Sequence, residues 1–525
     1  MESEGRARGE SKWLNWPGAL LAGAISGLLV NLTLPFLRWW PLIWVSLVPL
    51  FLYWMATSKP RWGGLAGWSF GLALYLGSMY WLGVFGWGAP LAVAALKGLI
   101  PALGGWLIVR LKGAGLSPSG NFGLYALLGA SLWVLLEYAQ TLGVLGLVWA
   151  FLPLGLARQP LFLQANTLWG MWGLSWGIAL FNLLLAGLLY ARLFKTPLSW
   201  RLAGGVSALF WLFILGFGYW RLHLEPLPLE APAPQKWGVV QLSTPQHLKF
   251  QPGYAASHLS ALLEASARAT RAGAQVILWP ETSVPYRHFL ESSYLRRQLG
   301  RAIRRQPAWY LVGSIEPAPP DGSYNVMSLW DPQGKYCDRY CKYNIVPFGE
   351  YLPGRPYWPE WVPGVKLVMN YKPGPGSHTL AVGETPVGVL ICFESMCTWL
   401  PRWHVLKGAQ ILVAPTNDAW FKRTSELPGH FDMAIMRAVE LARPVIPAGN
   451  TGVSGFVDAY GRVEQESQIE EVCVLSQEVY PRREMTLYAR WGDWWVYACA
   501  LFLVGYSLRA WRQLKSRRPP LKEGD

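Results

Sequence analysis

Eight long apolar runs constrain the fold of this chain more than any other feature of its sequence. The first seven lie near 16–34, 41–56, 65–85, 89–109, 122–142, 167–190 and 203–221, and the eighth lies at 492–508. About 20 apolar residues span the hydrocarbon core of a bilayer as a helix, so each run is a candidate membrane span. Only 15% of the residues are charged, against about 25% in soluble domains. We therefore expect a polytopic membrane protein.

The spacing of the runs predicts about eight helices around one large hydrophilic insert. Basic residues gather in alternate connections, such as Lys59, Arg110 and Lys195, and again in the tail. Because positively charged loops stay in the cytoplasm, both termini are expected inside and the insert outside. The expected division is a cytoplasmic segment 1–15, helices over 16–221, an extracytoplasmic domain over 222–490, a last helix over 491–509 and a basic cytoplasmic tail over 510–525.

The net charge of +15, from 46 Lys and Arg against 31 Asp and Glu, raises the question of nucleic-acid binding. Much of this charge sits in the connections that set the membrane orientation. Outside the tail, the sequence shows no basic stripe interleaved with aromatic residues, which nucleic-acid binding favours. We therefore expect no nucleic-acid partner.

Two patterns inside the apolar runs are interpreted as packing rather than chemistry. Glycines four residues apart, at 23 and 27 and at 63, 67 and 71, let helices approach closely. The segment 173–177 (GLSWG) matches the G-x-S-x-G pattern of hydrolases, but a nucleophile elbow follows a strand and opens a helix. Here the segment lies within an apolar run, so the match is attributed to chance.

The insert alternates between strand and helix patterns. Strands are expected at 237–242, 275–279, 308–314, 326–330, 385–391 and 410–414, and helices at 255–272, 293–305 and 430–442. This alternation indicates an α/β layered domain of about 250 residues.

Three reactive side chains stand where expected strands end, which is where α/β domains place their chemistry. These are Glu281 after QVILWP, Lys342 in YCKYNIVPFGEY and Cys392 after VGVLI. Taken singly, they are more often a loop or helix-capping carboxylate, a solvated lysine and a buried structural thiol. Together they supply a base, a cation for an oxyanion and a nucleophile, the set that acyl transfer through a thioester needs.

The ordered motifs WPET, KYNIVPFGEY, ICFES and TNDAWF resemble the nitrilase superfamily with its Glu-Lys-Cys centre. With apolar helices on both sides, the whole chain resembles the apolipoprotein N-acyltransferase family. The resemblance includes LLEY (135–138), MRAVELARP (436–444) and GNTGVSGFVDAYGRV (449–463). It implies a polytopic α-helical membrane domain with an inserted extracytoplasmic α/β nitrilase-like domain, an α-β-β-α sandwich, in a bacterial inner membrane with that domain on the periplasmic side.

The resemblance also implies roles for individual residues. Glu281 is expected as general base, Cys392 as nucleophile and Lys342 as oxyanion stabiliser, with the Phe393 backbone N–H as its partner. Glu350 is expected to hold the lysine in place. The residues expected around the substrate pocket are Glu394, Asn325, Trp420, Trp149 and Gly146.

Two positions depart from the family pattern. Phe393 stands where many members carry Tyr, and Phe250 where relatives often have Trp. Both keep an aromatic surface but lack the polar group. The aromatic segment 355–367 is either a loop that dips into the membrane interface or an ordinary exposed loop.

No cofactor and no metal are expected. The seven histidines show no paired ligand spacing, and no phosphate-binding or dinucleotide motif is present. Six cysteines are too few and too scattered for a disulfide framework, and Cys337 and Cys341 are expected as free thiols.

The expected reaction moves a fatty acyl chain from a phospholipid, through a thioester on Cys392, to the α-amino group of S-diacylglyceryl-cysteine in apolipoproteins. The expected partners are therefore a phospholipid donor, diacylglyceryl-modified apolipoproteins and the bilayer. The Glu-Lys-Cys trio alone fits equally a membrane-anchored amidase of small extracytoplasmic amides. A transporter is a third hypothesis, with Glu137 and Lys97 as its intramembrane ionisable residues, but no internal repeat supports it.

Overall fold

Helices form in all eight apolar runs. This computed structural model describes residues 13–113, 117–143, 146–225, 233–249, 251–359 and 368–516. The helices of the runs are α1 (Trp16–Thr33), α2 (Val48–Ala56), α3 (Pro60–Ser78), α4 (Gly88–Gly113), α5 (Phe122–Ala139), α8 (Met171–Phe194), α9 (Arg201–His223) and α16 (Trp494–Ser516). Within the described residues, five of them (α1, α4, α5, α8 and α9) are long and apolar enough to cross a bilayer.

The second run differs from the expected single helix over 41–56. It divides into a 3₁₀ turn, η1 (Trp40–Trp44), and the nine-residue helix α2. Each piece has a proline in its first turn, Pro41 and Pro49, where the missing N–H costs nothing. A proline cannot continue a preceding helix, so the run restarts there. Helix α2 is about 14 Å long, too short to cross the roughly 30 Å hydrocarbon core alone.

The spaced glycines lie at helix contacts, as expected. A Cβ on Gly23 would stand 2.2 Å from the Ala66 carbonyl oxygen, and one on Gly67 would stand 2.1 Å from the Pro101 carbonyl oxygen. Helices α1, α3 and α4 therefore pack backbone against backbone.

The two intramembrane ionisable residues, Glu137 and Lys97, pair with hydrogen-bonding groups of the bundle. Glu137 accepts hydrogen bonds from the Leu152 backbone N–H and the Ser175 hydroxyl. Lys97 donates to the Gln140 carbonyl oxygen at 3.1 Å. Ser175 lies within helix α8, so the 173–177 segment is no nucleophile elbow. These contacts join helices and connections of the bundle, which is a structural role.

The insert contains two β-sheets. The seven-stranded sheet has the order β13-β1-β2-β4-β5-β6, with β3 paired to β4, and the six-stranded sheet has the order β12-β11-β10-β9-β8-β7. The first comprises β1 (Gln235–Gln241), β2 (Val276–Leu278), β3 (Val284–Arg287), β4 (Trp309–Pro317), β5 (Ser323–Trp330), β6 (Tyr336–Cys341) and β13 (Cys473–Val479). The second comprises β7 (Leu380–Val382), β8 (Thr385–Val389), β9 (Ile411–Thr416), β10 (Val445–Gly449), β11 (Gly455–Val457) and β12 (Val463–Glu466).

The six strands expected from sequence are present as β1, β2, β4, β5, β8 and β9. The expected helices are present as α11 (Pro252–Arg271), α12 (Ser293–Arg305) and α14 (Glu426–Leu441). Sequence analysis missed strands β3, β6, β7, β10, β11, β12 and β13. Four of these, β3, β7, β11 and β12, have only three or four residues. Such strands are too short to show the two-residue alternation on which the expectation rests.

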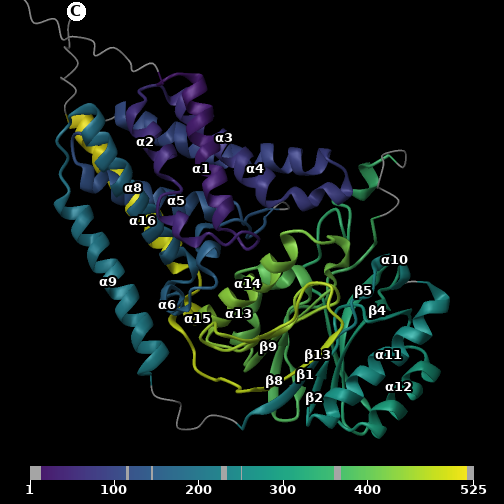
Figure 1. Cartoon of the computed structure of the whole chain (residues 1–525). Helices are drawn as coiled ribbons and strands as arrows, with labels where there is room; N and C mark the ends of the chain where they lie inside the picture. The colour runs from purple at the N-terminus through teal and green to yellow at the C-terminus, as the bar shows by residue number, and fades with distance from the viewer. Residues whose placement is uncertain are drawn as a thin grey trace, which may run out of the picture.

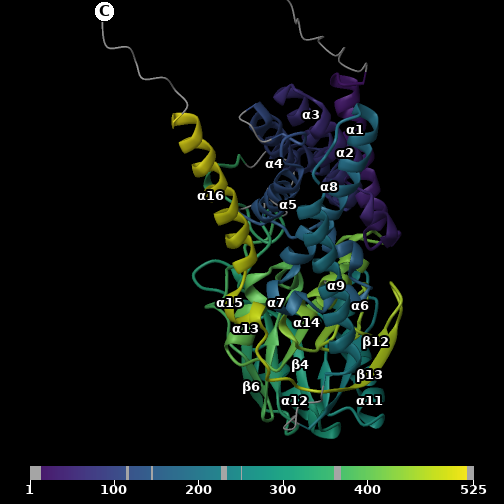
Figure 2. The ribbon, with the colours of Figure 1, turned by 90° about the vertical axis from the view of Figure 1, so that its left-hand side faces the viewer.

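The sheets face each other and carry helices on their outer sides, which gives the expected α-β-β-α sandwich (Figures 1 and 2). Buried side chains from both sheets, such as Trp237, Leu278, Val389 and Val413, form the core between them. Helices α11 and α12 cover the first sheet, with Leu262 and Ile303 in their core. Helix α14 and the short α13 (Trp399–Leu406) lie between the second sheet and the apolar helices (Figure 1).

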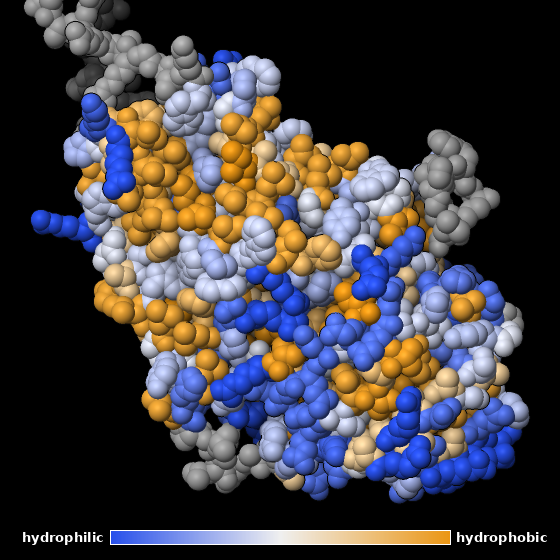
Figure 3. All heavy atoms as spheres, viewed as in Figure 1, coloured by the Kyte–Doolittle hydropathy of each residue, from blue (hydrophilic) through white to orange (hydrophobic). Residues whose placement is uncertain are grey.

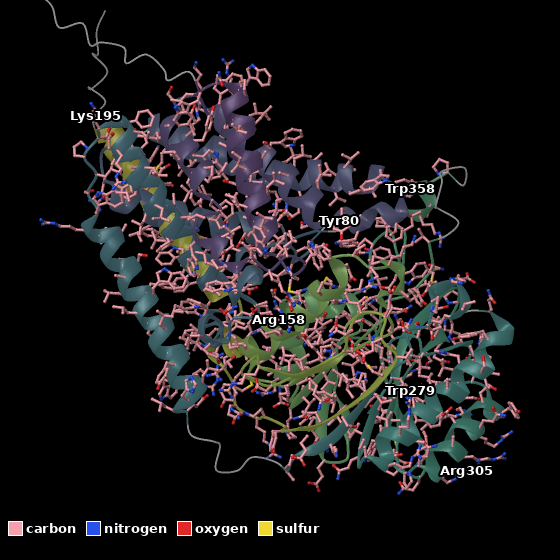
Figure 4. All side chains as sticks on the ribbon, viewed as in Figure 1. Tyr80, Arg158, Lys195, Trp279, Arg305 and Trp358 are labelled. Atoms are coloured by element: carbon pink, nitrogen blue, oxygen red, sulfur yellow. The ribbon has the colours of Figure 1, made fainter. Side chains whose placement is uncertain are left out.

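Helix α14 joins the sandwich to the helical bundle, and every one of its residues is buried. Asp432 on α14 accepts a 2.6 Å hydrogen bond from Arg158 Nε, and Glu440 accepts one of 3.0 Å from the Met171 backbone N–H. Figure 4 shows Arg158 and Tyr80 at this junction. The face in Figure 3 is largely hydrophobic over the bundle and largely hydrophilic over the sandwich. The polar sandwich and the apolar bundle are thus joined through buried contacts of α14.

Close helix packing makes Gly67 intolerant of a side chain. We expect Gly67→Ala to lower the stability by about 1–3 kcal/mol, because the new Cβ overlaps the Pro101 carbonyl. Gly205→Ala in α9 is the matched control, since nothing lies within 4 Å of its Cβ position. Thermal unfolding in detergent measures the difference, and equal melting temperatures would show that α3 and α4 do not pack as described.

Candidate active site

The three expected reactive residues meet at one edge of the sandwich. Glu281 follows β2, Lys342 follows β6, and Cys392 opens the 3₁₀ turn η5 (Cys392–Met396) after β8. Lys342 Nζ lies 3.8 Å from Glu281 Oε1, and the Cys392 thiol interacts electrostatically with both residues. Two of the side chains thus come from the first sheet and the third from the second, so packing of the sheets assembles the site.

The Glu281 carboxylate is buried and held on one side by an amide. Asn325 on β5 donates a 2.5 Å hydrogen bond from Nδ2 to Glu281 Oε1. Burial raises the pKa of Glu281, and the charge of Lys342 and the Asn325 hydrogen bond only partly oppose this. A carboxylate with a raised pKa is suited to take up a proton near neutral pH.

The backbone around Glu281 is also fixed. Gly313 on β4 packs directly beneath it, because a Cβ there would stand 2.3 Å from the Pro280 carbonyl oxygen. Lys249 donates a 3.0 Å hydrogen bond from Nζ to the Glu281 carbonyl oxygen. Sequence analysis did not single out Lys249, and no spacing in the sequence relates it to Glu281.

Lys342 is buried between two carboxylates. Its Nζ donates a 2.9 Å hydrogen bond to Glu350 Oε1, and Glu350 Oε2 accepts from the Val346 backbone N–H at 2.8 Å. Burial alone lowers the pKa of the ammonium, but the charges of Glu350 and Glu281 outweigh it and raise the pKa above its ordinary value. Lys342 therefore carries a full positive charge in a place with little water.

Cys392 has an unusual backbone. Its φ of +53° lies in the left-handed region, which residues other than glycine rarely adopt and which is common at active sites. Its carbonyl oxygen accepts hydrogen bonds from His430 Nε2 at 2.9 Å and from Ser395 Oγ at 3.0 Å. Burial and the nearby Glu281 carboxylate raise the pKa of the thiol well above its usual range, against the opposing charge of Lys342. The resting sulfur is a thiol.

Glu394 ties the lysine loop to the cysteine loop. Its Oε1 accepts from the Tyr340 hydroxyl and from the backbone N–H groups of Tyr343 and Asn344, and its Oε2 accepts from the Ile391 N–H. The four donors lie within 2.7 to 3.0 Å. This residue, expected near the pocket, thus fixes the relative positions of Lys342 and Cys392.

The other expected site residues lie in two places. Asn325 and Glu350 join the central cluster, and Phe393 is half-buried beside Cys392. Trp420, in η6 (Asp418–Trp420), is 45% exposed. Trp149 donates to the Ser78 carbonyl oxygen and packs against Gly429 at the start of α14, and Gly146 lies three residues before it. Trp149 is therefore part of the junction between bundle and sandwich.

A buried triad that sequence analysis missed lies behind Cys392. His430 Nδ1 is 3.1 Å from Asp418 Oδ1 and 3.2 Å from Glu426 Oε1. The three residues present ligand-type atoms within 4.8 Å of one another, a donor set that a divalent cation also accepts. The four-residue spacing of Glu426 and His430 on one helix was the available signal, but Asp418 lies on another element.

Among the described residues all six cysteines are free, and Cys337 and Cys341 lie along the single strand β6. Within the aromatic segment 355–367, Arg355–Tyr357 forms the short turn η4 with Tyr357 89% exposed. Phe250 and residues 360–367 lie outside the described residues.

Two family models match the chain. Carbon-nitrogen hydrolase matches residues 238–477, and apolipoprotein N-acyltransferase N-terminal domain matches residues 26–184. Proteins named apolipoprotein N-acyltransferase are similar over nearly the full length. The one from Geobacter metallireducens is 31% identical over 94% of this chain and 95% of its own, and that from Gloeobacter violaceus is 30% identical over 93% of each. A solved mutant of the Nesterenkonia AN1 amidase, from the nitrilase superfamily, covers 50% of this chain and 95% of its own at 20% identity and a TM-score of 0.38.

The electrostatics of the site predict how Cys392 reacts with iodoacetamide. Because its pKa is raised, alkylation at pH 7 is expected to be slow and to accelerate as the pH rises past 9. Glu281→Gln removes a negative charge that opposes the thiolate, so alkylation at pH 8.5 is expected to be severalfold faster than in the unmodified protein.

Peptide mass spectrometry measures alkylation at Cys392 separately from the other cysteines. Glu384→Gln, at an exposed position in the turn between β7 and β8, is the matched control and is expected to change nothing. Slower alkylation of Glu281→Gln at every pH would contradict this prediction. It would mean that, in the resting protein, Cys392 is already a thiolate and Glu281 holds its proton.

Proposed function

This chain belongs to the apolipoprotein N-acyltransferase family, and from that membership we propose how its residues carry out the reaction. The enzyme is an acyltransferase of a bacterial membrane. In the proposed reaction it moves a fatty acyl chain from a phospholipid to the α-amino group of S-diacylglyceryl-cysteine at the N-terminus of an apolipoprotein. The observation that carries the proposal is the buried cluster of Glu281, Lys342 and Cys392 in a domain packed against apolar helices.

In the first half-reaction, Glu281 takes the proton from Cys392 Sγ as the sulfur attacks the ester carbonyl of a phospholipid. The oxyanion that forms is stabilised by the Lys342 ammonium and the Phe393 backbone N–H. When the intermediate collapses, the carbon–oxygen bond of the ester breaks. The departing alkoxide takes the proton from Glu281, which leaves a lysophospholipid and a thioester on Cys392.

In the second half-reaction, the α-amino nitrogen of the apolipoprotein attacks the thioester carbonyl. Glu281 takes a proton from the nitrogen, and the same two donors stabilise the second oxyanion. The carbon–sulfur bond then breaks, Glu281 returns the proton to Cys392 Sγ, and an amide is formed. One carboxylate thus acts as base and then as acid in each half-reaction.

The electrostatics support these roles. Glu350 holds Lys342 charged, so the lysine stabilises the oxyanion as a cation and does not compete with Glu281 for the proton. The raised pKa of Glu281 makes it a stronger base than an exposed carboxylate. Glu281 and Lys342 are almost fully buried, which limits the access of water to the thioester.

The junction between sandwich and bundle supports a lipid substrate. Removing an acyl chain from the bilayer costs about 0.8 kcal/mol for each CH₂ exposed to water, so the catalytic domain has to come to the membrane. Helix α14 packs against the bundle, and its residue His430 donates a hydrogen bond to the Cys392 carbonyl oxygen. A small-amide hydrolase has no need of this attachment, although the trio itself fits amide hydrolysis.

We further propose the orientation of the chain in a bacterial inner membrane. Residues 16–221 and 491–509 would lie in the membrane, 222–490 on the periplasmic side, and 1–15 and 510–525 in the cytoplasm. The distribution of basic residues supports this orientation. Lys195, between α8 and α9, lies at the end of the molecule remote from Arg305 in the sandwich (Figure 4).

The reaction predicts distinct effects of two substitutions. Cys392→Ala is expected to abolish both the thioester and the product, because no nucleophile remains. Glu281→Gln is expected to slow thioester formation about 10²- to 10⁴-fold through loss of the general base. The assay incubates purified protein with phospholipid and a diacylated lipopeptide and detects triacylated peptide by mass spectrometry. Full activity of either variant contradicts the mechanism, and ammonia release from small amides in place of triacylated peptide favours an amidase.

The orientation predicts which thiols a membrane-impermeant maleimide reaches. In cells with a permeabilised outer membrane, exposed Cys337 in the sandwich is expected to react, and the Lys195→Cys thiol is expected to react only after the inner membrane is opened. Mass spectrometry of the two peptides reads out labelling from the same sample. The reverse order of labelling would place the sandwich in the cytoplasm.

A further inference from the structure

His430 connects helix α14 to the peptide bond that follows the proposed nucleophile. From α14, its Nε2 lies 2.9 Å from the Cys392 carbonyl oxygen, and the imidazole is only 5% exposed. Helix α14 lies against the second sheet, from which the cysteine loop emerges (Figure 1). The mechanism above does not use this contact.

The groups around His430 determine its protonation. A carbonyl oxygen only accepts, so Nε2 carries a hydrogen. Nδ1 faces the carboxylates of Asp418, from η6, and Glu426, from its own helix, at 3.1 and 3.2 Å. Burial lowers the pKa of His430, but the charges and hydrogen bonds of Asp418 and Glu426 outweigh it and raise the pKa well above its usual value. The ring is an imidazolium that donates from both nitrogens.

The Cys392 carbonyl and the Phe393 N–H belong to the same planar peptide unit and point in opposite directions. A donor that holds the oxygen therefore also fixes the direction of the N–H. Pulling on the oxygen with a positive charge polarises the peptide, which strengthens the N–H as a donor at its other end. This restraint acts where it is needed, because Cys392 holds a left-handed conformation that an L-residue does not favour.

We propose that His430 is a positioning residue for the oxyanion site: its imidazolium holds and polarises the Cys392–Phe393 peptide, so that the Phe393 N–H points at the developing oxyanion. This inference rests on the proposed acyl transfer, in which that N–H is one of the two oxyanion donors. Asp418 and Glu426 hold the ring and its charge in place. Ser395 Oγ is the second donor to the same oxygen, at 3.0 Å and without charge.

The test separates two reactions of the same sulfur in the full-length protein in detergent. Acylation by phospholipid passes through an oxyanion, whereas alkylation by iodoacetamide does not. His430→Phe is expected to slow single-turnover acylation about 100-fold, toward the cost of losing one oxyanion donor, with the alkylation rate changed less than about twofold. Intact-mass spectrometry follows both reactions.

Two variants separate position from charge. His430→Gln places a neutral N–H toward the Cys392 oxygen and is expected to recover about tenfold of the lost acylation rate, because a neutral hydrogen bond is weaker than a charged one. Ser395→Ala removes the uncharged donor to the same oxygen and is expected to slow acylation no more than about threefold. Thermal unfolding shows whether His430→Phe folds. If it does not, His430→Gln is the test: its acylation is expected to be slower while its alkylation rate is unchanged.

Several results would overturn the inference. Equal losses of acylation and alkylation would mean that His430 acts on the thiol, and unchanged acylation in His430→Phe or in His430→Gln would remove its role. A loss with Ser395→Ala as large as with His430→Phe would contradict the role of the charge. Loss of activity with EDTA and its recovery with Zn²⁺ would assign the triad to a metal. Acylation of the unmodified protein by phospholipid tests the proposed function separately. If the unmodified protein takes up no acyl chain, the proposed function itself fails.

Discussion

The buried ammonium of Lys342 is the constraint on which the rest of the site depends. A charge with 1% of its surface exposed is stable only if it is paired, and here Glu350 lies 2.9 Å away and Glu281 3.8 Å away. Asn325 bridges the two carboxylates, and Glu394 fixes the loop that carries the lysine. Burial raises the pKa of Cys392 and of Glu281 above their ordinary values, and the charge of Lys342 only partly opposes this. The site therefore rests as a thiol beside the carboxylate that we propose as its base.

Helix α14 connects this chemistry to the membrane. It is buried between the second sheet and the apolar helices, and its polar residues point to both sides. Asp432 pairs with Arg158 of the bundle, and His430 bonds the carbonyl of Cys392. Such a helix fixes the distance between the apolar helices and Cys392, which the proposed transfer from a lipid requires. The close glycine contacts of α1, α3 and α4 serve the same end, because a rigid bundle gives α14 a defined surface to pack on.

Sequence analysis predicted the architecture well where the physics is local. Long apolar runs became helices, and six strands of the sandwich lie where apolar β-prone residues predict them. The seven-residue strand β13 and the six-residue strand β6 were missed. Glu281, Lys342 and Cys392 were identified because each follows a strand and because their motifs resemble a family. The second apolar run was predicted wrongly as one helix, since the effect of Pro49 on a continuous apolar stretch was overlooked.

His430, Asp418 and Lys249 were missed because their roles depend on contacts between elements far apart in the chain. Trp149 was expected around the substrate pocket, and its packing against Gly429 could not be predicted because it depends on how two domains dock.

The central claim is that Cys392 carries a fatty acyl chain between two lipids. The most direct measurement is the intact mass of the protein as purified from its native membrane, followed by peptide mapping. The account predicts a fraction with the added mass of a fatty acyl group on Cys392, released by neutral hydroxylamine and discharged within one turnover by a diacylated lipopeptide. A protein that bears no acyl group on Cys392 after incubation with phospholipid, while still making triacylated peptide, would contradict it.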